Sequence, residues 1–190
     1  MKKYYLATLM LFALTAIATA QTWTNDPAHS RLGFTIKHMT ISEVSGRFAD
    51  FTIKATTTKP DHSDLKVEVT AQIASINTDV EARDKHLKSP DFFDSEKYST
   101  LTFSSNYNKK LSKDTYKMVG NLTMHGITKS VTLTVKYLGE VVNPMNKKRT
   151  VGFKITGSVK RSDFGIGAKF PEAVLSDNVD IVADAEFTQN

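Results

Sequence analysis

Hydrophobic and polar residues alternate with a period of two along most of the chain. Between 130 and 137, for example, Leu133 and Val135 alternate with Thr132 and Thr134. Successive side chains of a β-strand point to opposite faces of a sheet, so this alternation is typical of strands with one face in the core and one in water. The clearest segments are 31–38, 66–73, 130–137, 151–160 and 179–187, and weaker ones are 44–56, 100–106 and 115–124. The pattern predicts an all-β chain with about eight antiparallel strands.

Eight long strands joined by short polar connections are compatible with a sandwich or with a closed barrel. Gly46, Gly120 and Gly157 fall inside the predicted strands and favour the barrel, because strand glycines often mark bends or close backbone contacts. A small outer-membrane barrel would alternate in the same way, with its apolar face toward lipid. Here the polar faces are rich in Lys and Thr, and no aromatic girdles stand at the strand ends. We therefore interpret the apolar face as the inner face of a single antiparallel barrel.

One segment, about 78–98, departs from the alternation and predicts short helices between strands. Thr78 and Glu81 have the spacing of a capping box, with Thr78 as N-cap, and predict a helix through about Lys88. Ser89 followed by Pro90 predicts the start of a second helix. One face of the first helix would carry Val80, Arg83, Asp84 and Leu87. Because this face would dock on the barrel, we expect its charged pair to need polar partners.

Residues 1–20 have the form of a secretory signal peptide. Lys2 and Lys3 precede a mostly apolar run over 4–17, and the segment 18–20 (Ala-Thr-Ala) fits a small-x-small cleavage site. The run is shorter than the roughly 20 apolar residues of a membrane span. An uncleaved anchor is the alternative. We expect cleavage after Ala20 and export to the periplasm, which leaves residues 21–190 as one domain.

Composition narrows the partners further. The chain has no cysteine, which excludes disulfides, thiolate metal sites and a cysteine nucleophile. Its formal net charge of +5 falls to +3 once Lys2 and Lys3 are removed. The densest basic run, 147–149, looks like a solvated turn, whereas a nucleic-acid surface would have a basic stripe with interleaved aromatic residues. We therefore expect no nucleic-acid partner.

The five histidines are the main candidates for catalytic or metal chemistry. No two of them have the HExxH or His-x(3–5)-His spacing that is typical of zinc sites. The simplest interpretation is that each one makes a hydrogen bond near the barrel rim. A cluster of His29, His38, His86 and Asp84 in three dimensions stays open, and would make a rim-site, metal-dependent hydrolase the alternative function. Since no Gly-x-Ser-x-Gly elbow is present either, we expect no catalytic residues and no cofactor.

Five segments in order along the chain carry a family resemblance. They are Asp26-Pro27-Ala28-His29-Ser30, the run from Arg83 to Asp94, His125-Gly126-Ile127-Thr128-Lys129, Arg161-Ser162-Asp163-Phe164-Gly165 and Leu175-Ser176-Asp177. Together they resemble the YceI-like family of periplasmic, lipocalin-like barrels, which are regarded as polyisoprenoid- or lipid-binding proteins. The resemblance covers essentially everything after residue 21. It implies a non-enzymatic carrier that holds a long apolar chain, such as a polyisoprenoid, a quinone or a fatty amide, along the barrel axis.

The pocket of such a carrier would draw on several segments. A barrel of eight strands is just wide enough either to be filled by side chains or to hold one small ligand, and the resemblance favours the ligand. By resemblance, the helices of 78–98 and the loop from Arg161 to Glu172 would frame the pocket. Phe92 and Phe93 would then serve as a plug, a lid or ordinary core, and Arg83 would hold a polar head group or pair with rim residues. The candidate ligand-binding residues are Phe34, Ile36, His38, Phe48, Arg83, Asp84, Leu87, Phe92, Phe93, Phe103, Leu122, Leu133, Phe153 and Phe164. A homodimer, and an interaction of the barrel surface with a membrane redox partner, are left open.

Overall fold

The computed structural model describes residues 21–59, 61 and 63–189, so the predicted signal peptide lies outside the described residues. Its strands are β1 (Gln21–Asn25), β2 (Arg31–His38), β3 (Ser42–Phe48), β4 (Phe51–Thr57), β5 (Lys66–Gln72), β6 (Ile76–Asn77), β7 (Thr100–Lys110), β8 (Thr115–Met124), β9 (Ile127–Val142), β10 (Arg149–Lys160) and β11 (Leu175–Gln189). One α-helix, α1 (Glu81–Leu87), and two 3₁₀ turns, η1 (Ile73–Ser75) and η2 (Arg161–Phe164), complete the elements of the described part of the chain. No helix among these residues is long and apolar enough to cross a membrane.

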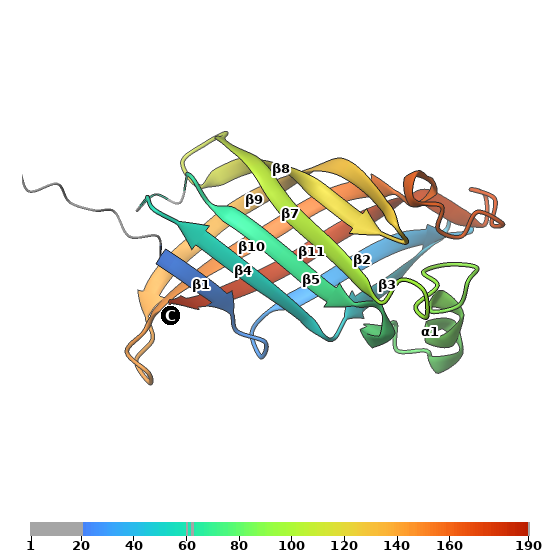
Figure 1. Ribbon diagram of the computed structural model, residues 1–190, viewed down its shortest axis with the longest axis horizontal. Coiled ribbons are helices and arrows are strands. Elements are labelled where there is room, and N and C mark those ends of the chain that lie inside the picture. Colours follow the sequence, from blue (N-terminus) through green and yellow to red (C-terminus); the bar gives the residue numbers. More distant parts are fainter. Residues whose placement is uncertain (1–20, 60, 62, 190) are drawn as a thin grey trace, which may run out of the picture.

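The strands form one closed antiparallel barrel (Figure 1). Its hydrogen-bonded order runs β1-β4-β5-β7-β8-β9-β10-β11, and β11 pairs back onto β1 to close the ring of eight. β2 continues the line of β1 along β11, and β3 pairs with β2. The segment 44–56 was predicted as one strand but forms parts of two, because β3 ends at Phe48 and β4 begins at Phe51 after a bend at Ala49 and Asp50. The predicted eight-stranded barrel is confirmed.

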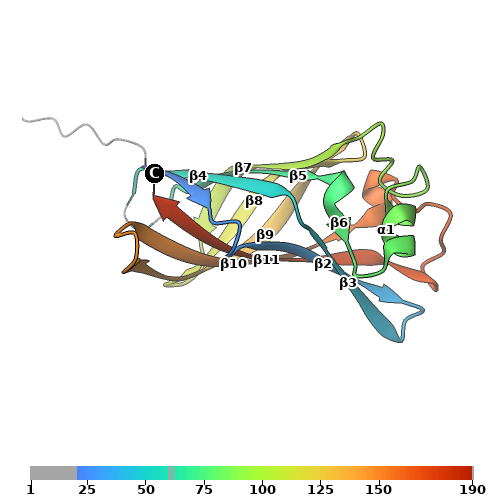
Figure 2. The same ribbon diagram turned by 90° about the horizontal axis from the view of Figure 1, so that it is seen from below.

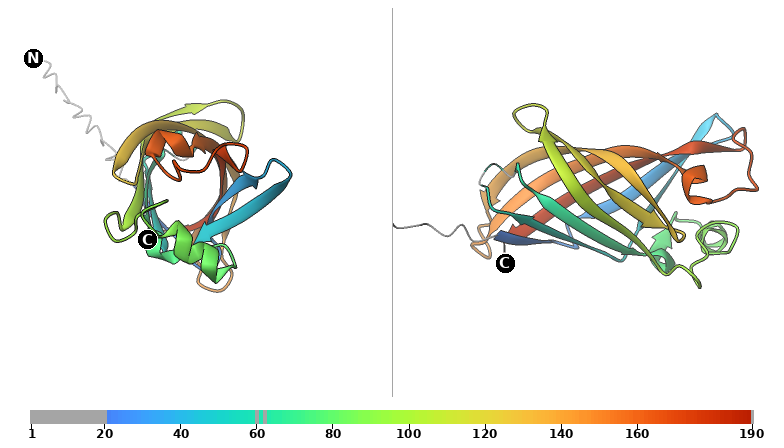
Figure 3. Two further views of the ribbon diagram at one scale, coloured as in Figure 1. Left: turned by 90° about the vertical axis from the view of Figure 1, so that its right-hand side faces the viewer. Right: turned by 45° about the horizontal axis from the view of Figure 1, so that its top comes forward.

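The two ends of the barrel differ. At one end, which we call the mouth, α1, the segment 161–174 and the β2–β3 hairpin stand around the rim (Figure 3, left). Figure 2 shows that the β2–β3 hairpin diverges from the barrel there. At the opposite end, which we call the closed end, Trp23 and Val151 are almost fully buried. The guanidinium of Arg149 lies 5.6 Å from the centre of the Trp23 ring and makes a two-point ion pair with Glu140, 2.8 Å for each bond.

The inner face of the barrel is the predicted apolar face. Leu133, Val135 and Phe153 are buried, whereas Thr132 and Lys154 next to them are exposed. This confirms the interpretation that the apolar residues of the alternating pattern point into the barrel.

Two strand glycines make room for aromatic rings. A Cβ atom at Gly120 would come within 2.4 Å of the Phe103 ring, and one at Gly46 within 2.3 Å of the Phe34 ring. Any larger residue at either position would displace the ring, so both glycines mark the close approaches that their positions in strands predicted.

The segment 78–98 differs from the prediction. α1 begins at Glu81, and Val80 occupies the N-cap position without a side-chain cap. Thr78 does not cap the helix: its hydroxyl donates to the carboxylate of Asp84 and accepts from Nε of Arg83 rather than from a helix amide. The second predicted helix is also absent from the described residues: the chain after Ser89 forms turns, with the amides of Phe92 and Asp94 both bonded to the Ser89 carbonyl at 3.0 Å.

Candidate ligand-binding cavity

A cavity of about 420 Å³ runs inside the barrel from the mouth toward the closed end. Most of its lining is aliphatic or aromatic and comes from the inward positions of the strands. The polar side chains that line it are few, and all of them come from elements at the mouth: His38, Thr78, Arg83, His86 and Arg161. The cavity is therefore an apolar tube with polar groups at its open end.

Twelve of the fourteen predicted ligand-binding residues line this cavity. They are Phe34, Ile36, His38, Phe48, Arg83, Leu87, Phe92, Phe93, Phe103, Leu122, Leu133 and Phe153. The other two do not. Asp84 turns to Thr78, and Phe164 is packed at 1% exposure in the core beneath the rim, where its carbonyl accepts a 2.9 Å bond from Nδ1 of His125.

Phe92 and Phe93 are packed into the wall of the mouth. The Phe92 ring stacks on Phe170 with 5.0 Å between the ring centres, and the imidazole of His86 lies nearly perpendicular to it with 4.9 Å between the centres. Phe93 meets Phe48 edge-on at 6.3 Å. Both rings also line the cavity. They are therefore part of the packed wall and at the same time border the space for a ligand.

Arg83 and Asp84 of α1 are linked through Thr78. Arg83 donates from Nε to the Thr78 hydroxyl and from Nη2 to the Thr78 carbonyl, each at 2.8 Å. Asp84 accepts from the Thr78 hydroxyl at 2.5 Å and from the Thr78 amide at 2.8 Å. The pair therefore finds its polar partners on the preceding turn. These bonds fix the start of α1 against β6 and leave Arg83 on the cavity wall.

Arg161 is a residue of the mouth that the predicted ligand-binding set did not include. It is only 7% exposed, and its guanidinium donates to the backbone carbonyls of Ser176, Ile166, Gly167, Phe170 and Leu175 at 2.6–3.1 Å. An arginine has five N–H groups, and here every one has an acceptor. Arg161 thus organises the loop between β10 and β11 into one side of the mouth. The Arg-Ser-Asp-Phe-Gly segment pointed to this loop, but the pattern of residue types along a sequence does not show which backbone carbonyls an arginine will bind.

A carboxylate supports the same loop from β11. Asp177 accepts from the amide of Ser162 at 3.0 Å and from its hydroxyl at 2.8 Å. Burial raises the pKa of Asp177, but the two bonds from Ser162 and the nearby charges of Arg161 and Lys160 together hold the pKa below its usual value. The ionised carboxylate therefore ties the start of the loop to its end.

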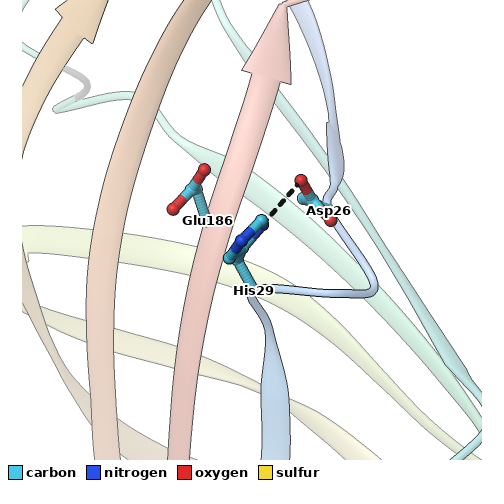
Figure 4. A group of neighbouring side chains, drawn as sticks. All are labelled: Asp26, His29 and Glu186. Atoms are coloured by element: carbon cyan, nitrogen blue, oxygen red, sulfur yellow. Dashed lines mark hydrogen bonds and ion pairs between the residues drawn. The ribbon is translucent and has the colours of Figure 1, made fainter. Parts of the chain in front are cut away.

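The cluster of His29, His38, His86 and Asp84, which the sequence left open as an alternative, does not form among the described residues. Within the described chain, the only group with metal-ligand geometry is Asp26, His29 and Glu186, whose ligand atoms lie within 4.8 Å of one another (Figure 4). Nδ1 of His29 lies 3.0 Å from the Asp26 carboxylate, which lowers the pKa of Asp26 and raises that of His29.

Asp26 and His29 lie in the turn between β1 and β2, and Glu186 lies on β11. Asp26 also accepts from the amide of Ala28 at 2.8 Å, which makes a tight turn, and none of the three residues lines the cavity. The bonds of Asp26 to Ala28 and His29 are those of the turn itself. The alternative function, a rim-site hydrolase, depended on the cluster of His29, His38, His86 and Asp84.

A closed antiparallel barrel with an apolar interior and one open end defines the lipocalin-like class. A family model described as the YceI-like domain matches residues 23–187, and the chain belongs to this family. It is 39% identical over 165 residues to the UPF0312 protein SAS2572 of Staphylococcus aureus (strain MSSA476), covering 87% of this chain and 92% of that one.

Solved structures agree with this assignment. The Campylobacter jejuni YCEI protein superposes with a TM-score of 0.75 at 33% identity, over 82% of this chain and 90% of that one. A polyisoprenoid binding domain from Saccharophagus degradans, described as implicated in plant cell wall breakdown, superposes with a TM-score of 0.65 over 88% of this chain and 98% of that one. At 15% identity the second likeness shows the fold alone.

Proposed function

We propose that this protein is a non-enzymatic binding or carrier protein that holds a long apolar chain, such as a polyisoprenoid, inside the barrel. The observation that carries the proposal is the cavity, with its apolar walls and its polar groups confined to the mouth. Burial of apolar surface stabilises a complex by about 25 cal/mol per Å², so an extended hydrocarbon gains free energy along the whole tube. The Saccharophagus degradans neighbour, whose description names polyisoprenoid binding, supports this ligand class at the level of the fold.

The polar head of the ligand is assigned to Arg83. Arg161 also lines the cavity, but all five of its N–H groups already have acceptors. Arg83 uses two of its five, both on Thr78, among the described residues. A hydroxyl, carbonyl or phosphate at the end of an apolar chain would be bound by the remaining donors of Arg83, and His38 and His86 are further polar side chains of the lining.

We also propose that the protein works in the periplasm after cleavage behind Ala20. The basic, apolar and small-residue regions of segment 1–20 support this location. A quinone and a fatty amide fit the same cavity chemistry. The homodimer and the membrane redox partner stay predictions.

The test is mass spectrometry of an organic extract from natively purified protein, beside intact-mass measurement of the chain. The proposal predicts a co-purifying long-chain lipid in the wild type. It predicts that Arg83→Ala loses most of its lipid with only a small drop in unfolding midpoint, since the substitution also removes the two bonds to Thr78. The matched control is Arg47→Ala, since Arg47 is a surface arginine with one 3.7 Å ion pair to Asp79 and does not line the cavity.

Equal lipid content in the two arginine variants would remove the head-group role of Arg83. An extract of the wild type without any lipid, together with no uptake of an isoprenoid alcohol supplied in detergent, would contradict the proposed function itself.

A further inference from the structure

The tip of the β2–β3 hairpin is an exposed apolar turn in a strained conformation. Met39 and Thr40 have φ angles of +50° and +61°, in the left-handed region that non-glycine residues rarely adopt. This turn holds Ile41 at 85% exposure and Met39 at 53%. Strained backbone persists where the surrounding structure demands it, often at functional surfaces.

The hairpin tip adjoins the rim of the cavity. The amide of Met39 donates to the carbonyl of Val174 at 2.9 Å, which joins the hairpin tip to the loop before β11. Val174 is 38% exposed and also lines the cavity, as do His38 and Val44 on the two sides of the turn. Met39 and Ile41 therefore stand directly beside the lining of the mouth. We call Met39, Ile41 and Val174 the apolar tip.

The turn can enter a nonpolar phase without burying an unpaired full charge. The segment 38–42 contains no Asp, Glu, Lys or Arg, and its single titratable group is the imidazole of His38. The first full charges along the two strands, Lys37 and Glu43, stand opposite each other in the β2–β3 register. Partial burial would therefore place opposite charges side by side, which is far less costly than burying one alone.

We propose that the apolar tip inserts into the surface of a lipid bilayer, so that a long apolar chain passes between membrane and cavity without crossing water. This inference rests on the proposed function, since it supplies the route by which the ligand enters. A second copy of the chain is a poorer occupant. A stable protein interface needs about 800 Å² and some 20–30 residues from each partner, and the apolar tip offers three side chains.

The closed end of the barrel provides a matched control. Val141 and Met145 are exposed to 62% and 92%, but they lie on the hairpin between β9 and β10, and neither lines the cavity. An apolar side chain there has the same affinity for lipid as one at the tip but no connection with the ligand path. Comparing substitutions at the two ends therefore distinguishes docking by the apolar tip from nonspecific hydrophobic binding to vesicles.

The test compares Met39→Asn/Ile41→Ser with Val141→Ser/Met145→Ser. Asparagine tolerates the left-handed conformation at position 39, so the turn is kept. Each protein is expressed with its own N-terminal segment, and its intact mass is measured, because the apolar run over 4–17 would itself bind vesicles. Flotation with phosphatidylcholine vesicles measures docking, and uptake of a C20 isoprenoid alcohol from the same vesicles measures transfer. Uptake from detergent micelles measures the cavity alone.

We expect the tip variant to lose about tenfold in both flotation and vesicle uptake, with micelle uptake and unfolding midpoint unchanged. The closed-end variant should match the wild type. Equal losses in the two variants, a loss confined to the closed-end variant, or a tip-dependent dimer in place of vesicle binding would each overturn the inference. Failure of micelle uptake in the wild type would count against the proposed function, and flotation would still report on docking.

Discussion

Arg83 and Arg161 both line the cavity, and their bonding partners separate their roles. Arg161 has all five N–H groups on carbonyls of its own loop, whereas Arg83 has two bonds to Thr78. The first is a structural anchor and the second retains donors for a ligand. Residue type and spacing do not distinguish them, because carbonyl acceptors are present at every position of any chain. Arg83 was predicted from the helix face, and Arg161 required the folded loop.

Replacing Arg161 with methionine should destabilise the protein by about 3 kcal/mol. Hydrogen bonds to a charged group contribute about 1.5–3 kcal/mol each, but the freed carbonyls near the surface regain part of that from water. Denaturant unfolding measures the change, and Arg47→Met, which removes one exposed ion pair, should cost less than about 1 kcal/mol. A loss below about 0.5 kcal/mol in Arg161→Met would show that the loop does not depend on its guanidinium.

Asp177 should make the stability of the mouth depend on pH. Its folded-state pKa is lowered by the bonds from Ser162, so its stabilising contribution is complete above the unfolded-state pKa of about 3.9. That contribution is lost as the pH falls through the lowered folded-state value. Asp177→Asn should therefore cost about 0.5–1 kcal/mol at pH 7, and the difference from the wild type should shrink below about pH 4. A difference that is the same at pH 7 and pH 3 would exclude the carboxylate as its source.

The strands were predictable because one physical constraint, an apolar inside and a wet outside, repeats at every second residue. β8 was expected over 115–124 and occupies Thr115–Met124. The segment 78–98 was predicted less well, since a capping box is a local motif and a tertiary bond can replace it. In the folded chain the Thr78 hydroxyl donates to the carboxylate of Asp84 and accepts from Nε of Arg83, so it accepts no bond from a helix amide. The helix then began at Glu81 instead.

Aromatic residues on inward positions should differ in their contribution to stability. Phe164 is 1% exposed and surrounded by packed atoms, so Phe164→Ala should cost about 3–5 kcal/mol. Phe34 is half-buried and borders the cavity, so its truncation removes contacts on one side only and should cost less than about 2 kcal/mol. Lys66→Ala and Thr132→Ala, at exposed positions on the outer face, should each destabilise the protein by less than about 0.5 kcal/mol. Denaturant melts that place Phe34→Ala level with Phe164→Ala would mean that the barrel is closed around Phe34 in solution.

At the scale of the whole molecule, the class of fold followed from the sequence but the interior did not. An eight-stranded barrel can be filled or hollow, and the choice depends on the rotamers of many inward side chains at once. The Phe103 ring, for example, lies over Gly120, in space that a side chain at position 120 would otherwise take, and it still lines the cavity. The resemblance favoured a hollow barrel, and the cavity of about 420 Å³ agrees with it.

The measurement that tests the central claim most directly is bound lipid per protein, by native mass spectrometry, in two tryptophan variants of adjacent residues on β10. Ile155 lines the cavity, and Thr156 next to it is exposed on the outer face. Ile155→Trp should fill part of the tube and displace the apolar chain, whereas Thr156→Trp should retain it at the wild-type level, with both variants folded by circular dichroism. Equal lipid occupancy in the two variants would show that the ligand is not held inside the barrel.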